Sequence, residues 1–198
     1  AAQWQGGPQA SPSPAGDGLS GQSPLRRLRR RARGPPRPLR NPTPSPPKGA
    51  YPMSVTIRPA AESDLPALAA LELACFAHPW SEKSLAETLG NGRSLFLLAE
   101  REGEALGYLG MEYVLDEGGI TNVAVFPAHR RQGIADALLN ELLRRAKGLG
   151  LATVTLEVRE TNAPAIALYQ KHDFVPVGRR KSYYTSPTED AILMTVTL

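Results

Sequence analysis

The segment at residues 120–147 constrains the fold of this chain more than any other, because a strand, a tight polar turn and a helix follow one another there. Residues 120–126 are mostly apolar and β-branched, which is typical of a strand. Pro127 ends the strand, since proline cannot donate a hydrogen bond to a sheet ladder. Apolar side chains then recur at helical spacing, so the pattern predicts a helix from about Gly133 to Lys147.

The turn between this strand and helix has the features of an anion-binding site. The first backbone N–H groups of a helix have no partner within the helix, and they lie at the positive end of its dipole. Gly133 lets a ligand approach the backbone, and Arg130 and Arg131 add positive charge. The alternative interpretation is a solvated turn, because many α/β proteins carry a basic turn before a helix.

The pattern on either side of this segment predicts a mixed α/β domain. We expect a strand at 54–58, a helix from an N-cap at Ser63 to about Phe76, and a helix at 82–89 that starts from Ser81. Strands at 94–100 and 105–115 precede the 120–126 strand, and a strand at 151–159 follows its helix. Thr161 or Asn162 then caps a helix that runs to about 172, and strands at 174–184 and 191–198 complete the chain.

The first 52 residues differ in composition from the rest. They hold 12 of the 19 prolines and an arginine-rich run at 25–33, with too little apolar content to offset the entropy of ordering, so we expect disorder. Three interpretations compete: an arm that binds RNA, a solvated linker, or an extension absent from the native protein. We favour the third, because Met53 stands where the globular pattern begins. The expected domains are therefore 1–52 and 53–198, with nucleic acid a partner only if the first segment is native.

The net charge of +4 is unevenly distributed. Residues 1–52 hold nine basic side chains against one acid, Asp17, which gives +8. Residues 53–198 hold 14 basic and 18 acidic side chains, which gives −4. The expected globular domain is therefore mildly acidic, which is compatible with a basic partner but too small a charge to identify one.

Cysteine usage and hydropathy indicate the compartment. Cys75 is the only cysteine, so no intramolecular disulfide can form and a reducing compartment is expected. No apolar run approaches the roughly 18–20 residues that a membrane-spanning helix needs. We therefore expect a soluble, cytoplasmic protein with no membrane partner. The three histidines share no metal-ligand spacing with Cys75 or with one another, so we expect no metal.

Two side chains stand out because they interrupt apolar patterns. Glu157 lies in the strand at 151–159, either on its solvent face or desolvated enough to have the pKa of a useful base. Tyr169 lies on a helix of otherwise small, apolar residues, and a tyrosine in such a place is more often part of the core. The residues alone favour the structural interpretation for both.

Specific sequence motifs change that balance. The run Arg130-Arg131-Gln132-Gly133-Ile134-Ala135 resembles the Q/R-x-x-G-x-G/A pyrophosphate loop of the GCN5-related N-acetyltransferases (GNAT), with Ala135 where glycine is commoner. Other motifs resemble the bacterial ribosomal-protein-alanine N-acetyltransferases within that superfamily. They are His78-Pro79-Trp80-Ser81-Glu82-Lys83, Leu115-Asp116-Glu117, Leu156-Glu157-Val158-Arg159, Asn162-Ala163, Ala165-Ile166-Ala167-Leu168-Tyr169, Arg179-Arg180-Lys181-Ser182-Tyr183-Tyr184 and Glu189-Asp190-Ala191. The resemblance covers 54–198 but not 1–52. A second departure is His172-Asp173, where the family more often has a Leu-Gly turn.

The resemblance implies a fold and a set of site residues. The fold is the GNAT acyl-CoA acyltransferase fold, a mixed central sheet of about seven strands flanked by helices. Acetyl-CoA would serve as co-substrate, with Glu157 as general base, acting through water, and Tyr169 as general acid toward the coenzyme A sulfur. Tyr183 and Tyr184 would hold the substrate's N-terminus, unless they only pack across strands. The implied cofactor-binding residues are Val123, Ala124, Val125, Arg131, Gln132, Gly133, Ile134, Ala135, Asp136 and Asn162. For 123–125 a core strand, and for Asn162 a helix N-cap, are compatible alternatives.

The function that the resemblance implies is acetyl transfer to the α-amine of an N-terminal alanine, on a small-subunit ribosomal protein. The amine would attack the thioester directly, without a covalent enzyme intermediate. One alternative is an acetyltransferase of this fold for other protein N-termini, lysines or small amines. A second alternative is a non-catalytic acyl-CoA-binding module that carries an RNA-binding arm.

Overall fold

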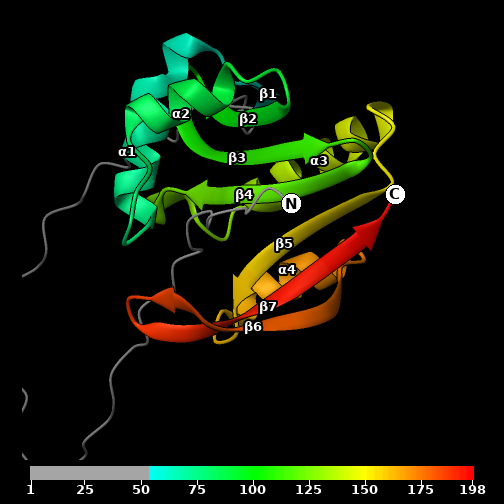
Figure 1. Ribbon diagram of the computed structural model, residues 1–198. Helices are drawn as coiled ribbons and strands as arrows, with labels where there is room; N and C mark the ends of the chain where they lie inside the picture. The colour runs from blue at the N-terminus through cyan, green and yellow to red at the C-terminus, as the bar shows by residue number, and fades with distance from the viewer. Residues whose placement is uncertain (1–53) are drawn as a thin grey trace, which may run out of the picture. The chain divides into compact units, whose positions relative to one another are not determined.

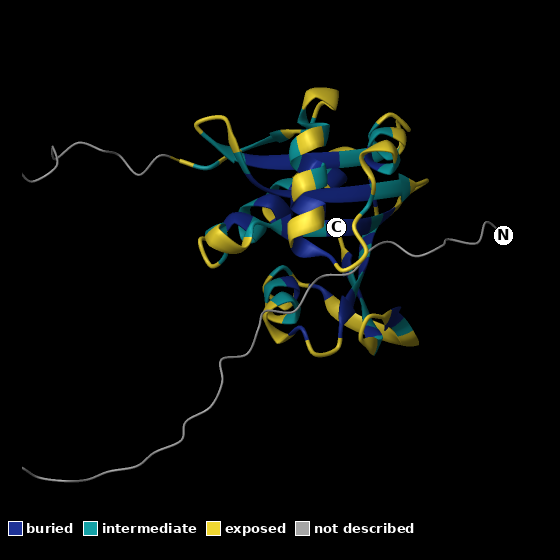
Figure 2. Ribbon diagram, turned by 90° about the vertical axis from the view of Figure 1, so that its left-hand side faces the viewer, coloured by how far each residue is buried: buried dark blue, intermediate teal, exposed yellow. Residues whose placement is uncertain are grey.

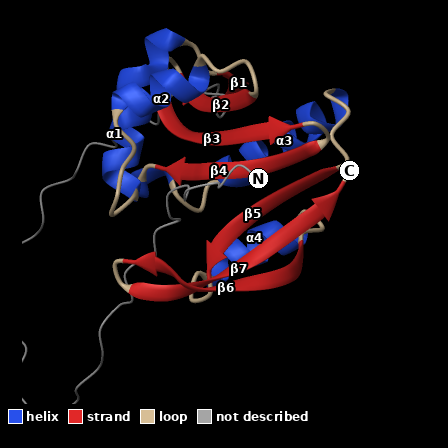
Figure 3. Cartoon of the chain, in the orientation of Figure 1, coloured by secondary structure: helices blue, strands red, loops and turns tan. Residues whose placement is uncertain are grey.

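The computed structural model describes residues 54–198, so the proposed extension 1–52 and the domain start at Met53 lie outside the described residues. In this range the structure confirms the predicted mixed sheet: seven strands in the order β1-β2-β3-β4-β5-β7-β6, with four α-helices (Figures 1 and 3). The strands are β1 Thr56–Pro59, β2 Ser94–Arg101, β3 Glu104–Val114, β4 Glu117–Val125, β5 Thr153–Arg159, β6 Val175–Thr185 and β7 Thr188–Thr197. The helices are α1 Leu65–Cys75, α2 Glu82–Leu89, α3 Ile134–Gly148 and α4 Ala163–Lys171.

Helices cover both faces of the sheet, and each face has its own apolar core. Neighbouring residues of a strand point to opposite faces, so Leu97 packs in one core while Phe96 and Leu98 pack in the other. Helices α3 and α4 contribute to the first core, and α1 and α2 contribute to the second. The central strands are accordingly buried along most of their length, whereas β6 at the edge of the sheet is largely exposed (Figure 2). Of the helices in residues 54–198, none is long and apolar enough to cross a membrane.

Strand β4 is irregular and then separates from its neighbour β5. Against β3, Gly110 pairs with Asn122 and Met111 pairs with Ile120, so Thr121 is an extra residue that forms a β-bulge. In the described part of the chain, β4 and β5 pair in parallel only as far as Gly119 and Thr155. Figure 1 shows the two strands diverging beyond this point. The second half of β4 therefore has an edge that β5 does not cover.

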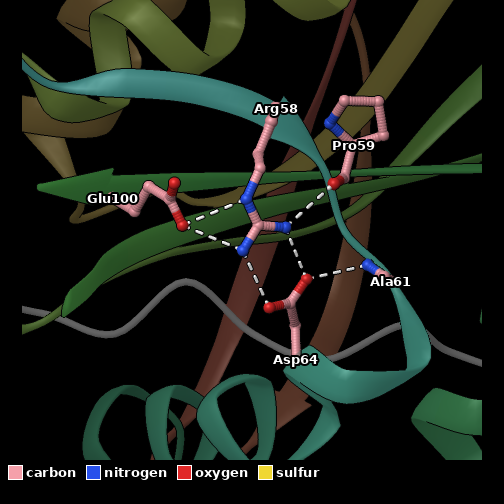
Figure 4. Close-up of polar contacts among 5 residues, drawn as sticks. All are labelled: Arg58, Pro59, Ala61, Asp64 and Glu100. Carbon is pink, nitrogen blue, oxygen red and sulfur yellow. Dashed lines mark hydrogen bonds and ion pairs between the residues drawn. The ribbon is translucent and has the colours of Figure 1, made fainter. Parts of the chain in front are cut away.

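The start of α1 differs from the sequence prediction. Ser63 is not its N-cap, because Glu62–Asp64 form a short 3-10 helix and α1 begins at Leu65. The Asp64 carboxylate accepts bonds from the backbone N–H of Ala61 (2.8 Å) and from the Arg58 guanidinium (2.7 and 2.9 Å) (Figure 4). Arg58 also bonds Glu100 of β2 at 3.0 Å. Asp64, directly before α1, is thereby connected through Arg58 to Glu100, 42 positions from Arg58, a contact that the local sequence does not show.

Candidate active site

The uncovered edge of β4 presents backbone polar groups toward the diverging β5. Phe126 N–H donates to the Leu106 carbonyl of β3 at 3.0 Å. Successive residues of a strand direct their N–H and C=O groups to alternate sides, so Ala124 faces β3 while Val123 and Val125 face the β5 side. An extended acyl chain laid along this edge could therefore pair with Val123 and Val125 as an additional strand would.

The turn that follows β4 exposes the start of α3. Arg131 and Gly133 both have positive φ angles, 62° and 80°, and Gly133 is the N-cap of the helix. An added Cβ at Gly133 would meet no atom within 4 Å, so a ligand can approach the backbone there. The first helical bond runs from Ala137 N–H to the Gly133 carbonyl, which leaves the N–H groups of residues 134–136 without helical acceptors. This confirms the predicted strand–turn–helix arrangement, with Arg131 and Gln132 exposed beside it.

The Arg130 side chain contacts the end of β4 and does not extend from the turn. Its Nε donates to the Val125 carbonyl at 3.2 Å, and its Nη2 lies 3.8 Å from the Cys75 sulfur. Cys75 is buried on α1, and its thiol donates to the same carbonyl at 3.4 Å. Of the two arginines in the turn, Arg131 is therefore the one whose side chain extends into solvent.

Asp136, in the first turn of α3, is neutralised by the end of α4. Lys171 Nζ donates to its carboxylate at 2.7 Å, and His172 Nε2 lies 2.8 Å from the same oxygen. These two contacts, with that of Lys171 the larger, hold the pKa of Asp136 below its ordinary value. A free carboxylate here would repel a phosphate, so this cluster removes an obstacle to anion binding at the helix start.

Glu157 lies on the face of β5 opposite Leu156 and Val158, and only 13% of its side chain is exposed. Burial raises the pKa of its carboxyl group, and the Arg180 guanidinium, 3.1 Å away, opposes that rise. Of the two interpretations of Glu157, the structure therefore supports desolvation over a solvent face. A partly desolvated carboxylate is a stronger base than one in water, which suits a general base.

Two tyrosines of β6, Tyr183 and Tyr184, lie near Glu157. The rings of Tyr183 and Tyr184 meet edge to face at 5.1 Å, and burial, together with the charges of Tyr183, Tyr169 and Glu157, raises the pKa of Tyr184. Tyr169 packs on Phe174 in the core, and burial raises the pKa of its phenol as well. A phenol that keeps its proton at neutral pH is suited to donate it. Tyr183 and Tyr184 thus lie near Glu157, whereas Tyr169 lies in the core near Tyr184.

Asn162 is the N-cap of α4, as the sequence allowed. Its side-chain oxygen accepts a bond from Ala165 N–H at 3.3 Å, and the side chain is buried. In residues 54–198, no group of three His, Cys, Asp or Glu side chains is placed to hold a metal ion.

Two buried charged residues have partners that sequence reasoning missed. Arg159 ends β5 directly after the buried Val158. Buried and partly exposed residues alternate along the rest of this strand, so two consecutive buried residues mark Arg159 as unusual. Glu72 lies on the buried stripe of α1 beside Leu68, Leu71 and Cys75, a position that helical spacing could have indicated. What each residue contacts depends on distant parts of the chain.

Comparison with known proteins agrees with this geometry. The model of the acetyltransferase (GNAT) family matches residues 65–174. The [ribosomal protein bS18]-alanine N-acetyltransferase of Escherichia coli K12 is 40% identical over 141 residues, which span 70% of this chain and 95% of that protein. Its counterpart from Salmonella typhimurium LT2 is 37% identical, with the same coverage of both chains.

Solved structures show the same fold. The crystal structure of the ribosomal-protein-S18-alanine N-acetyltransferase from Escherichia coli has a TM-score of 0.68 and 39% identity, and covers 73% of this chain and 94% of that one. An acetyltransferase from Salmonella typhimurium, solved with its cofactor acetyl-CoA, has a TM-score of 0.65 over 73% and 94% of the two chains. That protein is only 20% identical, so its likeness is one of fold.

The chain therefore belongs to the GNAT family of acetyltransferases, in its branch of bacterial ribosomal-protein-alanine N-acetyltransferases. It is an enzyme, an N-acetyltransferase.

Proposed function

We propose that this enzyme transfers the acetyl group of acetyl-CoA to the α-amine of an N-terminal alanine on a small-subunit ribosomal protein. The observation that carries the proposal is the position of Glu157, largely buried on β5 just beyond the point where this strand leaves β4, with Arg180 of β6 at 3.1 Å. The relatives that share 37–40% of the sequence are named for this activity on ribosomal protein bS18. Because ribosomal proteins are made in the cytoplasm, the proposal also assigns the enzyme to that compartment.

The donor would be held by two parts of the site. The edge of β4, residues 123–125, would pair with the extended arm of acetyl-CoA through Val123 and Val125. The start of α3 would receive the pyrophosphate through the N–H groups after Gly133, together with the exposed Arg131 and Gln132. These residues fit the group, because the turn is open and its one carboxylate, Asp136, is already paired.

Ile134, Ala135 and Asn162 complete the proposed cofactor-binding set. Acetyl-CoA supplies the acetyl group as an activated thioester.

Glu157 and Tyr169 would perform the two proton transfers. Glu157 takes a proton from the substrate ammonium, through water, so that the free amine can attack the thioester carbon. The C–N bond would form as the C–S bond breaks, Tyr169 would give its proton to the leaving sulfur, and the second proton lost from the nitrogen would return to the Tyr169 phenolate through water. Each transfer is typically worth about 10²–10⁴ in rate. The buried settings of both side chains, which raise their pKa values, support these roles.

Tyr183 and Tyr184 would bind the backbone of the incoming peptide. Both lie on β6 close to Glu157, and Tyr183 is the more exposed of the two. Because burial and the Glu157 charge raise the pKa of Tyr183, its hydroxyl remains a hydrogen-bond donor at neutral pH.

The test is acetylation of matched peptides. One peptide begins with alanine followed by basic residues, and its control has the same sequence with a blocked N-terminus. We expect mass spectrometry to place the acetyl group on the α-amine of the first peptide and to find the blocked peptide unmodified. Acetylation of lysines in the blocked peptide would contradict the proposed substrate. Binding of acetyl-CoA without transfer to either peptide would contradict the proposed activity on this N-terminus.

A further inference from the structure

Arg159 at the end of β5 is among the largest fully buried side chains in the described part of the chain, with 1% of it exposed. It lies two residues after Glu157 on the same strand. A guanidinium in the interior is costly unless hydrogen bonds and an opposite charge compensate it. The groups that compensate the Arg159 charge therefore identify the segments that this side chain holds together.

The partners of Arg159 lie in and beside the turn between β6 and β7. Nη1 donates to Glu189 Oε2 at 2.8 Å and to the Pro187 carbonyl at 3.2 Å, and Nη2 donates to the Ser186 carbonyl at 3.1 Å. The guanidinium carbon lies 4.2 Å from the centre of the Tyr184 ring. One side chain thus contacts both sides of this turn and an aromatic ring of β6.

Glu189 extends the connection to the start of α4. Its Oε1 accepts bonds from Thr161 N–H and from Thr161 Oγ1, both at 2.7 Å, and Thr161 directly precedes the N-cap Asn162. Burial alone would raise the pKa of Glu189, but the bonds from Thr161 and Arg159 hold it below its ordinary value. The Arg159–Glu189 pair therefore joins three segments: the end of β5, the start of α4 and the β6–β7 turn.

We propose that Arg159 is a positioning residue that fixes the β6–β7 turn, and with it Tyr183 and Tyr184, relative to Glu157. The geometry favours this role because the planar fork of arginine reaches two carbonyls and a carboxylate while its face lies on the Tyr184 ring. The expected effect of Arg159 on peptide binding rests on the proposed function. Its expected effect on the order of the β6–β7 turn is independent of that function.

The variant that tests the proposal is Arg159→Lys, which keeps the charge but loses the fork. We expect faster hydrogen–deuterium exchange at residues 182–190 and unchanged exchange in β2, β3 and α3, measured by mass spectrometry on the full chain. In steady-state kinetics we expect the KM for the alanine peptide to rise by about tenfold, which is the effect of losing about 1.4 kcal/mol of binding. The Kd of acetyl-CoA should change by less than about twofold.

Two further variants make the result interpretable. Arg144→Lys is the matched control, because Arg144 is an exposed arginine that pairs with Glu141 on α3. Arg144→Lys should leave three quantities unchanged: hydrogen–deuterium exchange at residues 182–190, the KM for the alanine peptide and the Kd of acetyl-CoA. Glu189→Gln removes the charge partner while keeping the length of the side chain, and should reproduce the effect of Arg159→Lys if that variant does not fold.

Three results would overturn the proposal: unchanged exchange at 182–190, faster exchange throughout the domain, or a parallel weakening of peptide and acetyl-CoA binding. If the wild type does not acetylate the peptide, the proposed function fails while the exchange measurement still decides the role of Arg159.

Discussion

The pairing of Glu157 with Arg180 determines how basic the proposed catalytic carboxylate can be. Burial raises the pKa of Glu157, and Arg180 at 3.1 Å favours the charged form. Because half of the Arg180 side chain is exposed, solvent screens this interaction. The two effects together leave a carboxylate that is partly desolvated but still able to ionise.

Removing the Arg180 charge should shift the pH dependence of catalysis. In Arg180→Met the pKa of Glu157 is expected to rise, so the base is protonated at higher pH. The acidic limb of the kcat/KM profile should then move to higher pH. The matched control is Lys181→Met at the next, exposed position, which should leave the limb in place. A limb that does not move in Arg180→Met, or that moves to lower pH, would contradict the assignment of Glu157 as the base.

Among the contacts between elements, those of Glu72 connect the irregular strand β4 to the helices. The Glu72 carboxylate, fully buried between α1 and the sheet, accepts bonds from the Tyr108 hydroxyl of β3 and from Asn122 Nδ2 of β4 (2.6 Å). It also accepts a bond from Trp80 N–H at 2.8 Å, ahead of α2. Asn122 directly follows the bulge at Thr121, so the carboxylate links α1 and the start of α2 to the shape of the β4 edge.

Truncation of Glu72 should therefore be severely destabilising. Glu72→Ala leaves two buried side-chain donors and a backbone N–H without their acceptor, and each such group costs about 1–3 kcal/mol. We expect the free energy of unfolding to fall by at least about 3 kcal/mol in urea titrations. Tyr108→Phe, which removes one donor and keeps the ring, should cost about 1–2 kcal/mol. A smaller loss for Glu72→Ala than for Tyr108→Phe would show that the cluster does not hold these elements together.

Elements whose limits depend on local signals could be predicted from the sequence. Helix α2 occupies the predicted 82–89, because the Ser81 side chain caps it by accepting a bond from Ser84 N–H at 3.1 Å. Helix α3 begins after Gly133 as predicted, because this glycine adopts the positive φ that its position requires.

Features that depend on distant partners could not be predicted. The strand expected at 120–126 begins earlier, at Glu117, because β3 and β5 pair with Gly118 and Gly119. The bulge at Thr121 is defined by its register against β3. Arg159 likewise contacts Glu189, 30 positions away, and Glu72 contacts Asn122, 50 positions away. For the same reason the motifs indicate which residues are candidates for the site, but not which contacts hold each of them.

At the scale of the whole domain, ion pairs make stability depend on pH. Bonds from Arg58 hold the pKa of Asp64 below its ordinary value, and Arg144 and Arg145 lower the pKa of Glu141 to about 2. A carboxyl group whose pKa is lower in the folded state stabilises the fold above its unfolded pKa, and this contribution is lost as the pH falls through the folded value. Glu72 and Glu157 have the opposite sign, because burial raises their pKa values.

The contribution of Asp64 to the pH dependence of stability can be measured by comparing the wild type with Asp64→Asn. The difference in unfolding free energy between the wild type and Asp64→Asn should be about 1–2 kcal/mol at about pH 7 and should shrink as the pH falls below about 3.9, the ordinary pKa of an aspartate. Urea titrations at several pH values measure this difference. Asp116→Asn, at an exposed turn, is the control and should show a small, pH-independent difference. A difference for Asp64→Asn that grows as the pH falls would contradict the sign of the shift.

The central claim is that this domain joins an open β4 edge, a base and an acid into one site for acetyl transfer. The measurement that tests it most directly is kcat for transfer from acetyl-CoA to the alanine peptide in wild type, Glu157→Gln and Tyr169→Phe. Calorimetric Kd values for acetyl-CoA would be measured on the same three proteins. We predict that both variants lose about 100-fold or more in kcat while their Kd values stay within about twofold of the wild type. Retention of wild-type kcat by either variant would contradict the assigned proton transfers.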